Sequence, residues 1–192
     1  MVIALSCEVE VVDQRDIQRL GGKAVDFPLS ALIKQLLDEN SMDYSFIFDV
    51  TYGEGRFYGY FRNEIDLLVG ADVGVWDWVV EPDLFIRKPV WSSYKVLKKL
   101  GLKPSLIVVD PPFQRGVRYN KRKMFSYVLG GPHIIVESAI KACRELSSKH
   151  VLIHWDRIET FNRKLVAAKG CKICARYLHD TNQPSYFYIL EV

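Results

Sequence analysis

Short apolar runs recur along the chain, separated by stretches whose apolar residues repeat at helical spacing. The runs are rich in aromatic and β-branched residues, which fit a pleated sheet. They predict strands at residues 44–50, 65–72, 82–86, 106–109 and 151–155, and an alternating stretch adds one at 7–11. Helices are predicted at 28–40, 92–100, 133–147 and 158–168. Strands that alternate with helices form mostly parallel sheets, so the pattern indicates an α/β protein.

The last two strand-like segments, 171–178 and 185–192, are separated by a polar loop and predict an antiparallel hairpin. The predicted fold is therefore a single-domain, Rossmann-like α/β fold, with a mostly parallel sheet and a C-terminal antiparallel hairpin. The 192 residues fit one domain. Residues 1–43 would supply an N-terminal strand and helix, and residues 44–192 the core.

The composition indicates the class of protein but does not indicate what it binds. Hydrophobic residues make up 49% and charged residues 26%, which is ordinary for a soluble globular protein. No run approaches the roughly 20 apolar residues of a membrane span, and no signal-peptide layout is present, so we expect a cytoplasmic protein without a membrane partner. A net charge of +3 does not by itself indicate a nucleic-acid partner.

Cysteine spacing raises the question of a metal site. Cys171 and Cys174 form a single CxxC inside a predicted strand, where residues three apart face opposite sides of a sheet. A zinc site would need a turn there and two more ligands. We therefore expect structural thiols and no metal.

The stretch 106–113 carries the clearest chemical signal. Four apolar residues predict a strand buried on both faces, and the acid, two prolines and aromatic that follow end it abruptly. Asp110 is thus placed at the carboxyl end of a central strand, where open α/β sheets bind ligands. Carbonyl and carboxylate acceptors beside the ring of Phe113 suit a flat base that carries an exocyclic amine.

A second motif lies upstream. The strand 44–50 runs into Gly53-Glu54-Gly55, and an acid followed by G-x-G commonly holds a nucleotide-like cofactor, because glycines let the backbone approach the ligand. The next strand ends in Asp72, 23 positions after Asp49. That spacing suits a carboxylate that receives the two hydroxyls of a ribose.

These motifs, in this order on this frame, resemble the S-adenosylmethionine-dependent amino-methyltransferases. The resemblance spans roughly residues 44–192, and the segment 49–57 is most similar to small archaeal ribosomal-RNA cytidine N4-methyltransferases. It implies a class I methyltransferase fold, S-adenosylmethionine as cofactor and no metal. The implied catalytic residues are Asp110, Pro111, Pro112 and Phe113. The implied cofactor-binding residues are Asp49, Thr51, Tyr52, Gly53, Gly55, Asp72, Trp76 and Asp83.

The resemblance also implies individual roles. Asp49 would lie near the ammonium end of the cofactor, Asp72 would take its ribose hydroxyls, and Asp83 or Trp76 would meet its adenine. Asp110 would accept hydrogen bonds from the target amine and stabilise the positive charge that develops on its nitrogen. Phe113 would stack on the base, which is worth roughly 1–3 kcal/mol.

RNA is the expected substrate, and rRNA processing the expected role. A chain of 192 residues leaves no room for the large target-recognition region of many DNA methyltransferases, whereas an unpaired RNA base is easily extruded. A basic cluster follows the catalytic turn, where phosphates flanking the target would pass. Its members, the expected RNA-binding residues, are Arg115, Arg118, Lys121, Arg122 and Lys123.

Other functions stay open at this point. The tetrapeptide also occurs in enzymes that methylate adenine N6, guanine N2 or a protein glutamine. A nucleotide-binding oxidoreductase is disfavoured because Tyr58 replaces the third glycine of GxGxxG. A catalytically silent RNA-binding module would be distinguished by a failure to bind cofactor. The oligomeric state and the number of methyl groups added are open.

Overall fold

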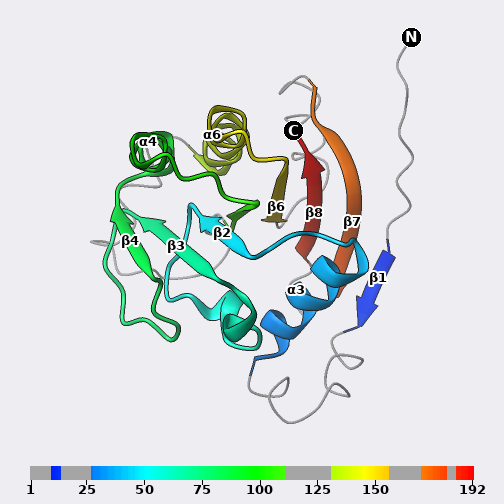
Figure 1. Cartoon of the computed structure of the whole chain (residues 1–192). Coiled ribbons are helices and arrows are strands. Elements are labelled where there is room, and N and C mark those ends of the chain that lie inside the picture. Colours follow the sequence, from blue (N-terminus) through cyan, green and yellow to red (C-terminus); the bar gives the residue numbers. More distant parts are fainter. Residues whose placement is uncertain (1–9, 14–26, 111–130, 156–169, 181–184) are drawn as a thin grey trace.

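The computed structural model describes residues 10–13, 27–110, 131–155, 170–180 and 185–192 (Figure 1). The strands are β1 (Glu10–Asp13), β2 (Phe46–Asp49), β3 (Leu67–Asp72), β4 (Leu84–Arg87), β5 (Leu106–Val109), β6 (His150–Trp155), β7 (Lys172–Asp180) and β8 (Ser185–Glu191). The α-helices are α3 (Pro28–Glu39), α4 (Val90–Leu100) and α6 (Gly131–Leu146). Two 3₁₀ helices, η2 (Arg56–Tyr58) and η3 (Arg62–Glu64), follow β2.

Within the described residues, the strands form one eight-stranded sheet in the order β1-β7-β8-β6-β5-β2-β3-β4. Strands β4, β3, β2, β5 and β6 run parallel to one another, and β8 is antiparallel to both β6 and β7. The chain goes from β2 outward through β3 to β4, then returns to the other side of β2 with β5. The neighbouring strands β2 and β5 therefore flank the point where the strand order reverses, which is where sheets of this kind bind ligands.

Side chains alternate between two apolar layers, one on each face of the sheet. Ile107 and Val109 pack with α4 and α6, whereas Leu106 and Val108 pack with α3 and η2. Figure 1 shows α4 and α6 on one face of the sheet and α3 on the other. Burial on both faces explains why β5 is apolar at every position.

The predicted α/β class, the mostly parallel sheet and the antiparallel C-terminal pair are confirmed. Boundaries differ by a few residues: β1 lies at Glu10–Asp13 instead of 7–11, and β7 extends to Asp180 because its pairing with β1 and β8 continues. The predicted helix 158–168 lies outside the described residues. In the part of the chain that the structure describes, no helix has the length and apolarity needed to cross a bilayer.

Candidate active site

The carboxyl edge of the parallel strands gathers three acids. Asp49 and Asp72 are the last residues of β2 and β3, and Asp110 directly follows β5. Asp49 and Asp72 are buried, with 2% of each residue exposed. By contrast, 34% of the Asp110 side chain is exposed. The structure therefore brings together the three acids that end the predicted strands, and it leaves Asp110 as the accessible one.

Asp49 is held by the loop that follows it. Its Oδ1 accepts hydrogen bonds from Thr51 N at 2.8 Å and Thr51 Oγ1 at 3.3 Å, and its Oδ2 accepts one from Tyr58 Oη at 2.7 Å. Burial raises the pKa of Asp49 to about 7, because the charged form loses water. The hydrogen bonds from Tyr58 and Thr51 oppose that rise, and the nearby charge of Asp110 adds to it.

Thr51 joins the two sequence motifs. Its hydroxyl oxygen accepts a hydrogen bond from Asp110 N at 2.6 Å while its proton points to Asp49. The segment after β2 is thereby tied to the residue after β5, across 59 positions of sequence. Thr51, predicted as a cofactor residue, uses its hydroxyl to fix where Asp110 leaves the sheet.

Asp110 is also held from the other side. Its Oδ1 lies 3.0 Å from His154 Nδ1, and His154 Nε2 lies 2.7 Å from Ser185 Oγ. Val109 and Ile153 are register partners in the parallel pair β5–β6, so the residues that follow them are neighbours. Ser185 begins β8, which is antiparallel to β6 and so starts at the same edge.

The contacts of Asp110, His154 and Ser185 match those of a serine-hydrolase triad atom for atom. The exposed residue differs, because here it is the acid and not the serine. In a hydrolase the serine meets the substrate and the acid is buried. Here Ser185 is 3% exposed and His154 5% exposed, whereas a third of the Asp110 side chain is open. The hydroxyl of Ser185 is therefore covered, and the carboxylate of Asp110 is the group of these three that solvent can reach.

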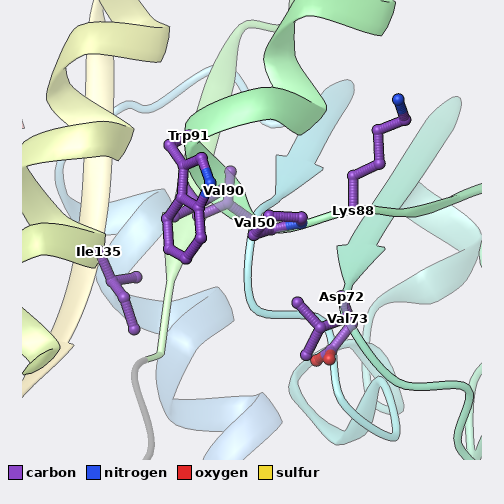
Figure 2. Close-up of a pocket in the computed structure, with 8 residues that line it drawn as sticks. Val50, Asp72, Val73, Lys88, Val90, Trp91 and Ile135 are labelled. Carbon is purple, nitrogen blue, oxygen red and sulfur yellow. The ribbon is translucent and has the colours of Figure 1, made fainter. Parts of the chain in front are cut away.

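Asp72 lies beside a hollow at the same edge (Figure 2). Its two oxygens accept Gly53 N at 3.2 Å and Gly74 N at 3.0 Å. The carboxylate of Asp72 therefore ties together the loops that follow β2 and β3, and its contact with the ribose hydroxyls stays a prediction. The hollow is lined by Asp72, by the stem of Lys88 and by apolar side chains that include Val73, Trp91 and Ile135.

The two glycines of the loop differ. Gly53 has a φ of +55°, and a side chain added there would meet nothing closer than 3.8 Å. Gly55 has a φ of +74°, but a Cβ there would lie 2.5 Å from Val80 O and 2.7 Å from Tyr52 Oη. The expectation that both glycines leave space for a ligand is therefore corrected for Gly55. On the side of its missing side chain, protein atoms fill the space.

The Tyr52 side chain packs into the protein interior. Its ring stacks on Tyr58 at 5.7 Å, and its hydroxyl donates to Val80 O at 2.8 Å. A Cβ at Gly70 would lie 2.6 Å from the same ring, so the ring covers the backbone of β3. The backbone N–H and C=O of Tyr52 are bonded to Ala71 O and Gly55 N, so its predicted cofactor contact stays a prediction.

The adenine assignment of Asp83 is corrected by the topology. Asp83 directly precedes β4, so it lies at the amino edge of the sheet, whereas Asp72 lies at the carboxyl edge. Its carboxylate accepts Leu68 N at 2.7 Å and pairs with Arg62 at 2.5 Å. Trp76, the other candidate, lies in the loop after β3 and close to Gly74, whose N–H binds Asp72. Of the two predicted residues, Trp76 is therefore the one that stays a candidate for the adenine.

Several predicted residues lie outside the described residues. These are Pro111, Pro112 and Phe113 of the catalytic tetrapeptide and the basic residues Arg115, Arg118, Lys121, Arg122 and Lys123. Their assigned roles remain predictions.

Sequence reasoning missed Tyr58, His154 and Ser185. One signal was present: His154 is a polar residue near the end of an apolar strand that the alternation of elements places beside 106–109. Ser185 carried no signal, because a serine that begins a strand is common. Tyr58 was noted only as the residue that breaks a glycine motif.

No protein-family model and no curated protein matches the sequence, whereas solved structures do match the fold. A putative S-adenosylmethionine-dependent methyltransferase from Streptococcus mutans has a TM-score of 0.58 and 10% identity over 86% of this chain, which spans 49% of that structure's length. An rRNA methylase from Streptococcus thermophilus has a TM-score of 0.54 and 15% identity, with 85% of this chain and 95% of that chain covered.

A third similar structure is the magnesium protoporphyrin IX methyltransferase of Synechocystis PCC 6803 with bound S-adenosylmethionine. It has a TM-score of 0.52 and 12% identity, and the match covers 93% of this chain and 83% of that chain. Identities this low establish a shared fold and not a shared substrate. The chain therefore has the fold of the S-adenosylmethionine-dependent methyltransferases.

Proposed function

We propose that the protein is an S-adenosylmethionine-dependent methyltransferase that modifies the exocyclic amine of a base in RNA, with cytidine N4 of ribosomal RNA as its substrate. One observation carries the proposal: hydrogen bonds join the buried Asp49, which precedes the loop Gly53-Glu54-Gly55, through Thr51 to the accessible Asp110. Asp110 is the first residue of the tetrapeptide Asp110-Pro111-Pro112-Phe113, the DPPF motif. The two motifs therefore belong to a single site at the strand-order reversal.

The residues present fit the cofactor. Asp72 is a buried carboxylate beside a largely apolar hollow, which suits the ribose hydroxyls and the flat adenine. Gly53 offers an open, positive-φ position between Asp49 and Asp72. When bound, S-adenosylmethionine supplies a methyl group on a sulfonium sulfur, which becomes a neutral thioether as the amine nitrogen takes the methyl.

Asp110 would act on the amine. The nitrogen of a ring amine shares its lone pair with the ring and is a weak nucleophile. A carboxylate oxygen that accepts one of its hydrogens pulls the nitrogen toward tetrahedral geometry and stabilises the positive charge that develops there. The proton that the nitrogen then loses can pass to Asp110 Oδ2, so charge and atoms balance without a metal.

The RNA part of the proposal rests on the sequence. Its support is the resemblance of the DPPF tetrapeptide to that of amino-methyltransferases and the basic cluster at Arg115–Lys123, all but Asp110 outside the described residues. Methylation of adenine N6 or guanine N2 would use the same chemistry, and the identity of the labelled nucleoside distinguishes the three.

The test incubates the protein with S-adenosylmethionine labelled in its methyl group and with unmodified small-subunit and large-subunit rRNA transcribed in vitro. Nucleoside digestion and mass spectrometry should find N4-methylcytidine. Isothermal titration of the same protein should show binding of S-adenosylhomocysteine and none of NAD. Binding of NAD alone would overturn the methyltransferase assignment, whereas label in another nucleoside would change the substrate and leave the cofactor assignment intact.

A further inference from the structure

We propose that His154 is the positioning residue of Asp110. In this proposal a neutral imidazole, held by Ser185, binds one carboxylate oxygen so that the other is aimed at the target amine. The inference rests on the proposed function and goes beyond it, because the sequence resemblance assigns no role to His154 or Ser185. Its basis is the accessible carboxylate of Asp110, which is hydrogen-bonded to the buried His154, which in turn is hydrogen-bonded to the buried Ser185.

The ring of His154 packs against two aromatic side chains. Phe187, its register partner on β8, stacks on it with ring centres 4.4 Å apart and planes 10° apart. Phe57 of η2 lies against it at 5.8 Å. With 5% of the residue exposed, the imidazole can neither rotate freely nor exchange its partners for water. A side chain held this rigidly suits the support of another group better than a direct reaction with substrate.

The two hydrogen bonds select one tautomer of the neutral ring. A carboxylate can only accept, so His154 Nδ1, 3.0 Å from Asp110 Oδ1, must carry the proton. Nε2 is then an acceptor, and the hydroxyl of Ser185, 2.7 Å away, must donate to it. Ser185 therefore stabilises the tautomer in which His154 donates to Asp110.

This arrangement gives the two oxygens of the Asp110 carboxylate different roles. Oδ1 is bound to His154, and Asp110 N is bound to Thr51, so the backbone and one oxygen are both fixed. Oδ2 has no hydrogen-bond partner within the part of the chain that the structure describes. A donor on Oδ1 thus leaves Oδ2 as the oxygen available to an amine, in an orientation set before substrate arrives.

The first test reads the tautomer directly and needs no activity. Long-range ¹H–¹⁵N NMR of the imidazoles, with the His154 signals identified by their loss in His154→Asn, should show a protonated Nδ1 and a bare Nε2 in the wild-type protein. Ser185→Ala removes the donor to Nε2 and should raise the population of the other tautomer. A bare Nδ1, or an imidazolium protonated at both nitrogens, would overturn the proposal.

The second test uses two matched variants under single-turnover conditions, with labelled S-adenosylmethionine and the rRNA transcripts. The amide of His154→Asn ends near the position of Nδ1 and keeps a donor for Asp110, whereas that of His154→Gln ends near Nε2 and leaves Asp110 unsupported. His154→Gln should lower the methyl-transfer rate roughly 10- to 100-fold, and His154→Asn should recover much of the loss. Affinity for S-adenosylhomocysteine should be unchanged in both.

The failures of the two proposals are distinguishable. If the wild-type protein methylates rRNA and His154→Gln does so at the same rate, the positioning role is wrong and the methyltransferase assignment stands. Equal losses in both variants, in step with their melting temperatures, would make His154 a structural residue only. If the wild-type protein binds no S-adenosylhomocysteine, the proposed function is wrong and the inference is rejected with it.

Discussion

At the scale of single residues, the three carboxylates of the candidate site are chemically alike but differ in how deeply they are buried. Asp49 and Asp72 are both buried, yet their oxygens bind different partners, and Asp110 alone of the three is open. The carboxylates of Asp49 and Asp72 satisfy N–H and O–H groups of the loops that follow their strands. The open carboxylate of Asp110 is the one free to meet a substrate.

The first prediction concerns Asp110. In Asp110→Asn the amide oxygen can face His154 Nδ1, which places the amide N–H₂ where the target amine needs an acceptor. A hydrogen bond to a charged group is worth about 1.5–3 kcal/mol, so its loss in the transition state should slow methyl transfer roughly 10- to 150-fold. Single-turnover methylation of rRNA measures the rate, and titration with S-adenosylhomocysteine should show nearly unchanged affinity. Near wild-type turnover would remove Asp110 from the mechanism.

The second prediction concerns the protonation of Asp49. Its pKa is about 7 in the folded protein, because of burial, against about 3.9 in an unfolded chain. Between these values the folded state holds a proton that the unfolded state has released, so the contribution of Asp49 to the free energy of unfolding falls as pH rises from about 4 to about 7. Asp49→Asn does not titrate. Its melting temperature, relative to the wild type, should therefore increase from about pH 5 to about pH 8.

Thermal unfolding of the wild-type protein and of Asp49→Asn, without cofactor, across that pH range measures the difference. The isosteric amide keeps an acceptor for Thr51 N and can still bind Tyr58, so the comparison isolates charge. A difference in melting temperature that does not change with pH would show that the pKa of Asp49 is not raised.

At the scale of elements, the loop between β2 and β3 takes its shape from contacts with distant segments. Gly55 N bonds Tyr52 O in a tight turn, Val79 N and Val80 N bond Glu54 O, and Asp72 binds Gly53 N. The turn is therefore fixed by the residues after β3 as much as by its own glycines. A glycine that resembles part of a ligand-binding motif can be required by such internal contacts.

The third prediction compares two glycines with nearly equal backbone angles. Gly55 and Gly101 have φ values of +74° and +70°, but a Cβ at Gly101 would meet nothing within 4 Å. Gly101→Ala should therefore cost only the backbone strain of about 1–2 kcal/mol. Gly55→Ala should cost about 1–3 kcal/mol more, because its Cβ overlaps Val80 O and Tyr52. Urea denaturation of both variants measures the free energies of unfolding, and equal values would contradict the overlap.

At the scale of the whole molecule, the sheet separates two edges with different roles. The carboxyl ends of the parallel strands carry the three acids, with Asp110 among them, and the hollow beside Asp72. Asp83 and the C-terminal end of α4, which leads into the start of β5, belong to the opposite edge. If the protein binds RNA, removal of positive charge from the cluster Arg115–Lys123, which follows Asp110 in the sequence, should weaken binding. Removal of positive charge at the second edge should not.

The fourth prediction tests this with two variants that each remove four positive charges. Replacement of Arg118, Lys121, Arg122 and Lys123 by Ala should weaken rRNA binding and lower the slope of log affinity against log salt by about 0.7–0.9 for each phosphate that is no longer neutralised. Replacement of the exposed Lys95, Lys98, Lys99 and Lys103 at the end of α4 and beyond it should leave that slope unchanged. Filter binding over a salt series measures both. Equal effects would mean that only net charge matters.

The sequence by itself determined the class of fold and the position of the principal acids. Apolar periodicity is a local property, so the strands, the helices that the structure describes and the C-terminal antiparallel pair could be predicted within a few residues. Because parallel strands end at one edge, the acids that end them could be expected to meet, and Asp49, Asp72 and Asp110 do.

Only the tertiary structure decided which groups support those acids. His154 lies 44 positions from Asp110 and 31 from Ser185, and Val80, which excludes a side chain at Gly55, lies in the segment after the next strand. Asp83 reads in the sequence like another acid near a strand, but it precedes β4, and the direction of the strand places it at the far edge. These relations depend on strand order, register and packing across the sheet, which join residues that no local pattern connects.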